Sequence, residues 1–142
     1  MVQNHSKYFK YFAGFISLFH FFIGIAGSLS SEWSQRVGKW VWGATIEVTP
    51  QYLYVSKLLN AYIIVFALVM MLLALNPLRY KKLVIVPIVA IALQLIQSIV
   101  FFDGMNAAFQ IEPARNIQNI VFSAILLIGI LLLRPKGNNE GQ

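Results

Sequence analysis

Polar side chains that could take part in chemistry are few in this 142-residue chain, and they recur at helical spacing. Lys57 and Asn60 are three residues apart. Further along, Gln94 is followed by Gln97 and Ser98, three and four residues later. Residues at these spacings share one face of a helix. Each segment therefore offers one polar stripe, whose amide, hydroxyl and ammonium groups can form hydrogen bonds.

Three interpretations of these stripes remain open. They can form a structural network of hydrogen bonds between helices, with Lys57 reaching the membrane surface or pairing with Asp103. They can instead line an outward-facing polar pocket for a small amphipathic ligand such as a quinone or a lipid, or contact a partner protein. The candidate pocket residues are Lys57, Asn60, Gln94, Gln97, Ser98, Asp103, Gln118 and Asn119.

His20 falls inside a long apolar segment. A histidine at membrane depth can bind haem or a pigment, or carry a proton. It can also be a structural residue whose ring is hydrogen-bonded to Ser17 or Asn60. His20 is therefore a possible ligand or proton site, and the cofactor is unknown. Because no second strong ligand lies beside it in the sequence, we predict no metal site.

Several classes of activity lack the residues that they need. The chain has no cysteine, which excludes disulfides and thiolate chemistry. The long apolar segments hold no carboxylate, so they offer neither an acid–base pair nor the coupling group of a proton-driven exporter. Asp103 and Glu112 are expected in a short outer loop, where solvation explains them. We therefore expect no catalytic residue, and the sequence favours a protein that is not an enzyme.

The elements that must position these residues are four long uncharged segments. Asp, Glu, Lys and Arg are absent from residues 11–31, 58–78, 83–102 and 116–133, which are 18 to 21 residues long. A helix needs roughly 20 apolar residues to cross a hydrocarbon core of about 30 Å. Only 11% of the residues are charged, whereas about 25% is usual in soluble domains. We therefore predict an all-α fold, an integral membrane four-helix bundle.

This bundle is expected to form a single membrane domain over residues 1–142. Thr49 followed by Pro50 is typical of a helix start, and Pro113 opens the last span in the same way. The first apolar segment is longer than the 7–15 residues or so of a signal peptide core, so we expect it to be retained. The predicted spans cover approximately residues 11–30, 51–75, 82–102 and 115–134, followed by a cytoplasmic tail at 135–142.

Membrane topology explains the net charge of +6 better than nucleic-acid binding does. The basic residues gather at helix ends and do not form a patch with interleaved aromatic residues. If the chain crosses four times, one side receives Lys7, Lys10, Arg79, Lys81, Lys82, Arg134 and Lys136. By the positive-inside rule, this bias predicts a multi-pass protein of the cell inner (plasma) membrane with both termini in the cytoplasm. No nucleic-acid partner is expected.

All three tryptophans lie in the connection between the first two spans. The first two of them, with Val37 and Val41, follow the spacing of an apolar helical stripe. We predict a short interfacial helix here, lying in the headgroup region and ended by Gly43. This segment either anchors the fold at the membrane surface or forms a lid over a cavity that opens to the outer face. The interfacial anchors are Trp33, Trp40 and Trp42.

Three short motifs carry a resemblance to a known group of proteins. They are YVSKLLNAY at Tyr54–Tyr62, ALNP at Ala74–Pro77, and LQLIQ at Leu93–Gln97 followed by Asp103. With its four-span topology, the chain resembles the small bacterial membrane proteins of the DoxX-like and BphX-like type. The resemblance implies the four-helix fold. It also implies an accessory role in quinone-linked oxidation, as in some members, and it assigns no catalytic residue.

The leading functional interpretation is a small, non-catalytic membrane protein that acts as an accessory or interaction subunit of a membrane complex. It follows from the lack of any complete catalytic or ion-coupling set of residues. The alternative is a binder or carrier of a quinone-like or lipid ligand in the outward-facing polar pocket. The expected partners are the lipid bilayer, other membrane protein subunits and a hydrophobic small molecule.

Overall fold

The computed structural model describes the backbone of residues 2–135 and the side chains of residues 6–135. All regular structure in this part of the chain is helical. Two short turns with other hydrogen-bonding patterns, a π-helical turn (η1) and a 3-10 turn (η2), interrupt the α-helices. The elements are α1 (Val2–Leu29), α2 (Ser31–Val37), η1 (Gly38–Trp42), α3 (Pro50–Leu75), η2 (Lys81–Val84), α4 (Ile85–Val100), α5 (Phe102–Phe109) and α6 (Pro113–Leu133).

Four helical segments are long and apolar enough to cross a membrane. This confirms the predicted all-α class with four spanning helices, and α2 supplies the short helix between the first two. The expected tail at 135–142 lies outside the described residues, apart from Pro135. The four segments are Ser6–Leu29, Pro50–Leu75, Lys81–Val100 and Pro113–Leu133.

Local sequence signals explain where the long helices begin and end. The Thr49 hydroxyl accepts a hydrogen bond of 3.1 Å from the backbone N–H of Tyr52, and Pro50 is the first residue of α3. An N-cap hydroxyl and a proline at the first position both favour a helix start, as the sequence predicted. The helix ends before Pro77, which lacks the N–H needed to continue it. Pro113 likewise opens α6.

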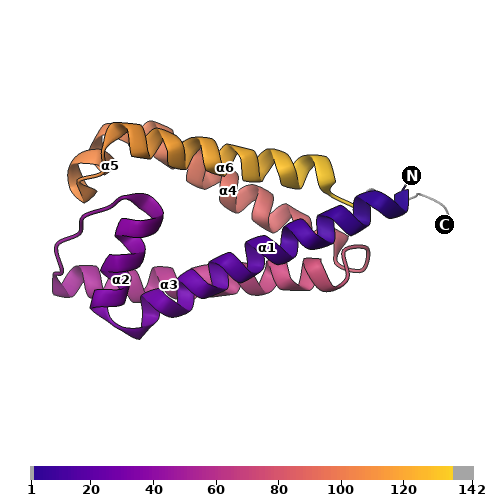
Figure 1. Cartoon of the computed structure of the whole chain (residues 1–142), viewed down its shortest axis with the longest axis horizontal. Helices are drawn as coiled ribbons and strands as arrows, with labels where there is room; N and C mark the ends of the chain where they lie inside the picture. The colour runs from indigo at the N-terminus through magenta and orange to yellow at the C-terminus, as the bar shows by residue number, and fades with distance from the viewer. Residues whose placement is uncertain (1, 136–142) are drawn as a thin grey trace.

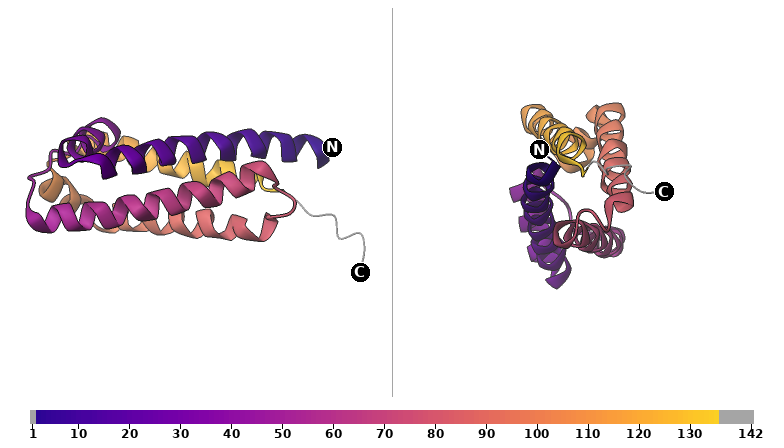
Figure 2. Two further views of the ribbon diagram at one scale, coloured as in Figure 1. Left: turned by 90° about the horizontal axis from the view of Figure 1, so that it is seen from below. Right: turned by 90° about the vertical axis from the view of Figure 1, so that its right-hand side faces the viewer.

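The four long helices form two antiparallel pairs, α1 with α3 and α4 with α6 (Figure 1). Viewed along the bundle, the helices lie around a common axis (Figure 2). The start of α1 and the end of α6 lie at one end of the bundle, which we call the terminal end. The elements α2, η1 and α5 lie at the opposite end, which we call the tryptophan end. In Figure 1 the two pairs are close at the terminal end and diverge toward the tryptophan end.

Small residues allow α1 and α3 to approach closely. A Cβ atom on Gly24 would lie 2.6 Å from Ile64 Cγ1 and 3.2 Å from the backbone oxygen of Asn60. The Ser17 hydroxyl donates a hydrogen bond of 2.8 Å to the carbonyl of Ala67 across the same interface. Lipid tails are as apolar as leucine, so helices in a membrane associate through such close packing and hydrogen bonds.

The buried core is distributed unevenly along the bundle. A small cluster toward the tryptophan end joins Ile23 and Ala26 of α1 to Val37 of α2, and its partly buried neighbours come from α1, η1 and α3. Among the described residues, α4 and α6 add no side chain to it. The larger core draws on all four long helices and on η2, through Phe9, Ala13, Ile16, Met70, Leu73, Val84, Ile91, Leu126 and Ile130.

The segment after α4 is helical, whereas the sequence predicted a loop around Asp103. The backbone turns at Phe101, with φ −104° and ψ 25°, and α5 then runs to Phe109. Gln110 ends α5 in the left-handed region, with φ 49°. The side chain of Asn116 on α6 donates a hydrogen bond of 2.7 Å to Asn106 Oδ1, which holds α5 against α6. Such a tertiary contact is invisible to sequence periodicity.

We expect Gly24→Val to weaken the pairing of α1 with α3, because the added side chain would overlap Ile64 and the Asn60 carbonyl. Overpacking of this kind costs about 1–3 kcal/mol, which lowers the Tm of the detergent-solubilised protein. Gly14→Ala is the matched control, because a Cβ there would lie 3.8 Å from Ala74 Cβ, an ordinary contact. Equal melting temperatures for the two variants would contradict this packing.

Candidate functional site

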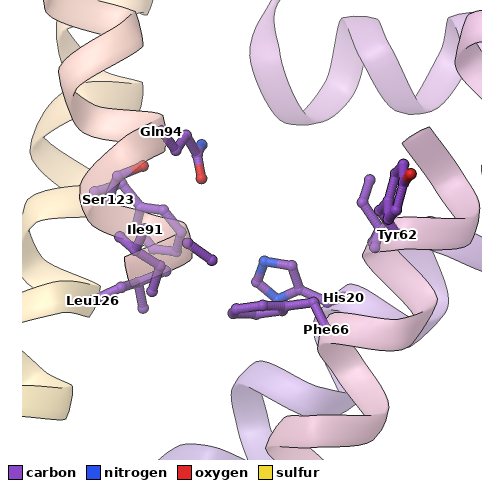
Figure 3. Close-up of a pocket in the computed structure, with 10 residues that line it drawn as sticks. His20, Tyr62, Phe66, Ile91, Gln94, Ser123 and Leu126 are labelled. Carbon is purple, nitrogen blue, oxygen red and sulfur yellow. The ribbon is translucent and has the colours of Figure 1, made fainter. Parts of the chain in front are cut away.

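A pocket of about 240 Å³ lies between the two helix pairs. Side chains of α1 and α3 form one wall, and side chains of α4 and α6 form the other (Figure 3). His20, on the first wall, precedes the end of α1 by a rise of about 14 Å, so the pocket lies well inside the bundle. The residues that line it are His20, Tyr62, Ile63, Phe66, Ala90, Ile91, Gln94, Phe122, Ser123 and Leu126.

The imidazole of His20 is held in one orientation on the α1 wall. Its Nδ1 lies 2.8 Å from the carbonyl oxygen of Ile16, which can only accept, so Nδ1 carries a proton. In the neutral ring, Nε2 is then a hydrogen-bond acceptor. The ring packs on Phe66 with 4.8 Å between ring centroids. The hydrogen-bond partner is therefore a backbone oxygen of the same helix, and it is neither Ser17 nor Asn60.

Gln94 of α4 and Ser123 of α6 stand opposite His20 in the pocket (Figure 3). Gln94 is exposed to the open space, whereas Ser123 is buried. The amide of Gln94 and the hydroxyl of Ser123 can each donate and accept hydrogen bonds. Polar groups from three helices thus border a space that is otherwise lined mainly by aliphatic and aromatic side chains.

Tyr62, Phe66 and Ser123 line the pocket, although they are absent from the pocket residues expected from the sequence. Tyr62 and Phe66 are four residues apart in a long apolar run, a pattern that also fits side chains facing lipid. Ser123 follows Asn119 by one helical turn, and this spacing extends the polar stripe of the last span. That spacing is the signal that could have identified Ser123.

Lys57 and Asn60 lie away from this pocket. Lys57 is exposed and lines a separate recess of about 220 Å³, together with serines near the junction of α1 and α2. Asn60 is only 6% exposed and lies between α3 and α1. A Cβ atom on Gly27 would be 2.6 Å from Asn60 Oδ1, and Asn60 Nδ2 has no hydrogen-bond partner.

Three further residues of the expected polar pocket follow Gln94 toward the tryptophan end. Gln97 is exposed and Ser98 is half-buried on α4. Asp103 is exposed in the first turn of α5. Of the expected pocket residues, Gln94 is the one that lines the pocket with His20. The part of the chain that the structure describes contains no group of three His, Asp or Glu residues able to hold a metal ion.

Gln118 and Asn119 belong to a set of contacts that ties α6 to η1. Arg115 Nη2 donates hydrogen bonds of 2.9 and 3.3 Å to the carbonyls of Trp40 and the residue after it. Arg115 Nη1 donates to Gln118 Oε1 at 3.3 Å, and Asn119 Nδ2 donates to the carbonyl of Trp42 at 3.0 Å. We call these contacts the η1 tether. They satisfy carbonyl groups that the end of a helical turn leaves without partners.

The tryptophans differ in their surroundings. Trp33 and Trp40 are exposed, and Trp42 packs against the small buried cluster of α1 and α2. Exposed indole rings at one end of a membrane bundle fit the headgroup region. Gly43 ends η1, as predicted, with φ 73°, and a Cβ there would lie 2.5 Å from Arg115 Cγ. The glycine therefore provides both the turn and the space that the η1 tether needs.

We expect Arg115→Ala to loosen the segment 38–46, because two backbone carbonyls lose a charged donor. Hydrogen bonds to charged groups are worth about 1.5–3 kcal/mol, so amide exchange there should accelerate about tenfold or more. Hydrogen–deuterium exchange mass spectrometry measures this. Lys39→Ala is the control, because Lys39 is exposed on η1 itself. Unchanged exchange in Arg115→Ala would show that the tether does not hold this segment.

Comparison with known proteins does not assign a function to this pocket. No protein-family model, curated protein or solved structure matches the chain. Its function is therefore inferred from the side chains that border the pocket.

Proposed function

We propose that this membrane protein binds a lipophilic small molecule of the quinone and quinol class in the pocket between the helix pairs. The observation that carries the proposal is the placement of His20 opposite Gln94 and Ser123 in a largely apolar space. Ligand pockets typically combine an apolar and aromatic lining with a few convergent polar groups. The proposed role is binding or carriage, and it includes no catalytic step.

The polar groups suit both redox forms of such a head group. The lone pair of His20 Nε2 can accept a hydrogen bond from a quinol hydroxyl. The hydroxyl of Ser123 and the amide N–H of Gln94 can donate to a quinone carbonyl. The aromatic ring of Phe66 offers a flat apolar surface beside His20. A ligand with polar groups on opposite sides of one ring therefore matches both walls.

The pocket size limits what can enter. Pockets for whole drug-sized ligands measure about 300–1,000 Å³. A volume of about 240 Å³ therefore suits a single substituted ring better than a complete isoprenoid quinone. The tail of the ligand would remain outside, among the apolar side chains and the lipid. Only the ring of such a ligand would then need specific contacts with the protein.

We expect His20→Leu to weaken binding of decylubiquinol more than binding of decylubiquinone, because the quinol loses its acceptor. Ser123→Ala should weaken binding of both forms, because its hydroxyl can donate to a quinone carbonyl and accept from a quinol hydroxyl. A lost neutral hydrogen bond is worth about 0.5–1.5 kcal/mol, so each change should be about 2- to 10-fold in Kd. Isothermal titration of the detergent-solubilised protein measures both affinities.

Matched variants on α4 provide the control. Gln94→Leu removes a polar group from the pocket, whereas Gln97→Leu removes the same group one turn away, outside the lining. The first should weaken binding of decylubiquinone and the second should not. Equal affinity in His20→Leu, Ser123→Ala and Gln94→Leu, compared with the unmodified protein, would refute the pocket as the binding site.

An accessory role in a larger membrane complex is the second candidate function. Gln97 favours it, because its amide is exposed on α4 within a membrane span. Polar side chains at this depth are costly unless they find a partner, and a neighbouring subunit would provide one. Native mass spectrometry of the gently extracted protein would detect such a subunit. A lone monomer would argue against this role and leave the pocket proposal untouched.

We also propose that the terminal end faces the cytoplasm, in the cell inner membrane. Basic residues near the ends of spans mark the cytoplasmic side. A cytoplasm-dependent reporter fused after Gln142 should therefore be active, and a reporter that requires export should be inactive at the same position. The reverse result would invert the orientation. The described basic residues at the terminal end are Lys7, Lys10, Arg79, Lys81, Lys82 and Arg134.

A further inference from the structure

A third cavity lies at the terminal end, nearer the start of the third spanning segment than the pocket that holds His20. It is a recess of about 450 Å³ between the start of the third spanning segment and the end of α6. Its rim carries Lys81 and Lys82 of η2 and Arg134, which follows α6. The two sides of the recess are about fifty residues apart in sequence, so the fold brings the cations together.

The positive charge of this recess is not balanced by any carboxylate of residues 6–135. All three basic side chains on the rim are exposed. Every acidic side chain among the described residues lies at the tryptophan end of the bundle, where the four are Glu32, Glu47, Asp103 and Glu112. An anion that enters the recess would therefore meet three cations and no competing carboxylate from residues 6–135.

The rest of the recess lining is apolar. It consists of Val84, Ile85, Ile88 and Pro135. Ile85 is 58% exposed, so it can cover part of a bound aliphatic chain. One wall thus combines a cationic rim at the end of a spanning helix with an aliphatic surface that continues into the membrane. An amphiphile with a negative head and an aliphatic tail is complementary to both parts.

We propose that this recess binds an anionic phospholipid from the leaflet next to the terminal end. Its phosphate lies between Arg134 and the lysines of η2, and one acyl chain lies along Ile85 and Ile88. A guanidinium can bind two phosphate oxygens at once, which gives the site geometry as well as charge. Basic pockets between membrane helices recognise lipid head groups in this way. The bound lipid links η2 to the end of α6.

Binding of dioleoylphosphatidylglycerol to the full-length protein, measured by a native mass spectrometry titration in detergent, tests this proposal. The variant K81Q/K82Q/R134Q should bind the lipid about 100-fold more weakly, since each basic residue contributes about fivefold. The charge-retaining variant K81R/K82R should bind as the unmodified protein does. If the triple variant does not fold, R134Q alone should lower the affinity about fivefold by the same reasoning.

A second triple variant separates a defined site from general attraction to positive charge. K7Q/K10Q/R79Q removes the same number of cations from the terminal end, but none of them lines the recess. It should retain the lipid affinity to within a few-fold. Equal losses in both triple variants would overturn the proposal, because they would indicate diffuse electrostatics.

Two further probes separate a phospholipid from other ligands. Dioleoylphosphatidylcholine, which has the same chains and no net charge, should bind much more weakly than the phosphatidylglycerol. Inorganic phosphate should not displace the anionic lipid at equal concentration, and Ile85→Asn should weaken the lipid only. Equal retention of both lipids would refute recognition of charge. Displacement by phosphate, or an unchanged lipid affinity in Ile85→Asn, would refute the lipid and assign the recess to a free anion.

Discussion

The close approach of α1 and α3 is the interaction on which the rest of this structure depends. Inside a bilayer, apolar side chains are already out of water, so the hydrophobic effect does not drive helices together. Helices pair instead where their backbones can come near each other. Gly24 and Gly27 leave no room for a Cβ, and Ser17 donates a hydrogen bond across the contact. α1 and α3 therefore form a tight unit with η1 and α2 at its end. The pair α4 and α6 is a separate unit that meets it through longer side chains.

This division explains why the polar groups in the spans have different environments. Asn60 lies within the tight unit, where its amide faces Gly27 and is closed off by packing. His20 lies on the edge of the same unit, and Gln94 lies on the other one, so both border the space between them. The basic recess lies at the terminal end of the second unit, between the start of the third spanning segment and the end of α6. The candidate sites thus occur where tight packing stops.

The four spans could be predicted from the sequence, because the length of a run and its lack of charge depend only on consecutive residues. Thr49, Pro50 and Pro113 mark helix starts through local chemistry, and Gly43 marks a helix end for the same reason. Which residues meet across the bundle depends on the orientation of each helix about its own axis, and this orientation is set by tertiary packing. The sequence assigned Asn60 and Gln94 to the same polar pocket, but the orientation of α3 about its axis turns Asn60 toward α1. The helix α5 was missed because a side-chain contact to α6 holds it in place.

The two helix pairs share a large core toward the terminal end, and at the tryptophan end the η1 tether joins them. α3 has 26 residues. Such a helix is about 39 Å long, and a rotation of about 5° at one end moves the other by about 3 Å. That displacement exceeds what the Arg115 hydrogen bonds can stretch. The Arg115 hydrogen bonds therefore hold the two helix pairs at a fixed separation at the tryptophan end.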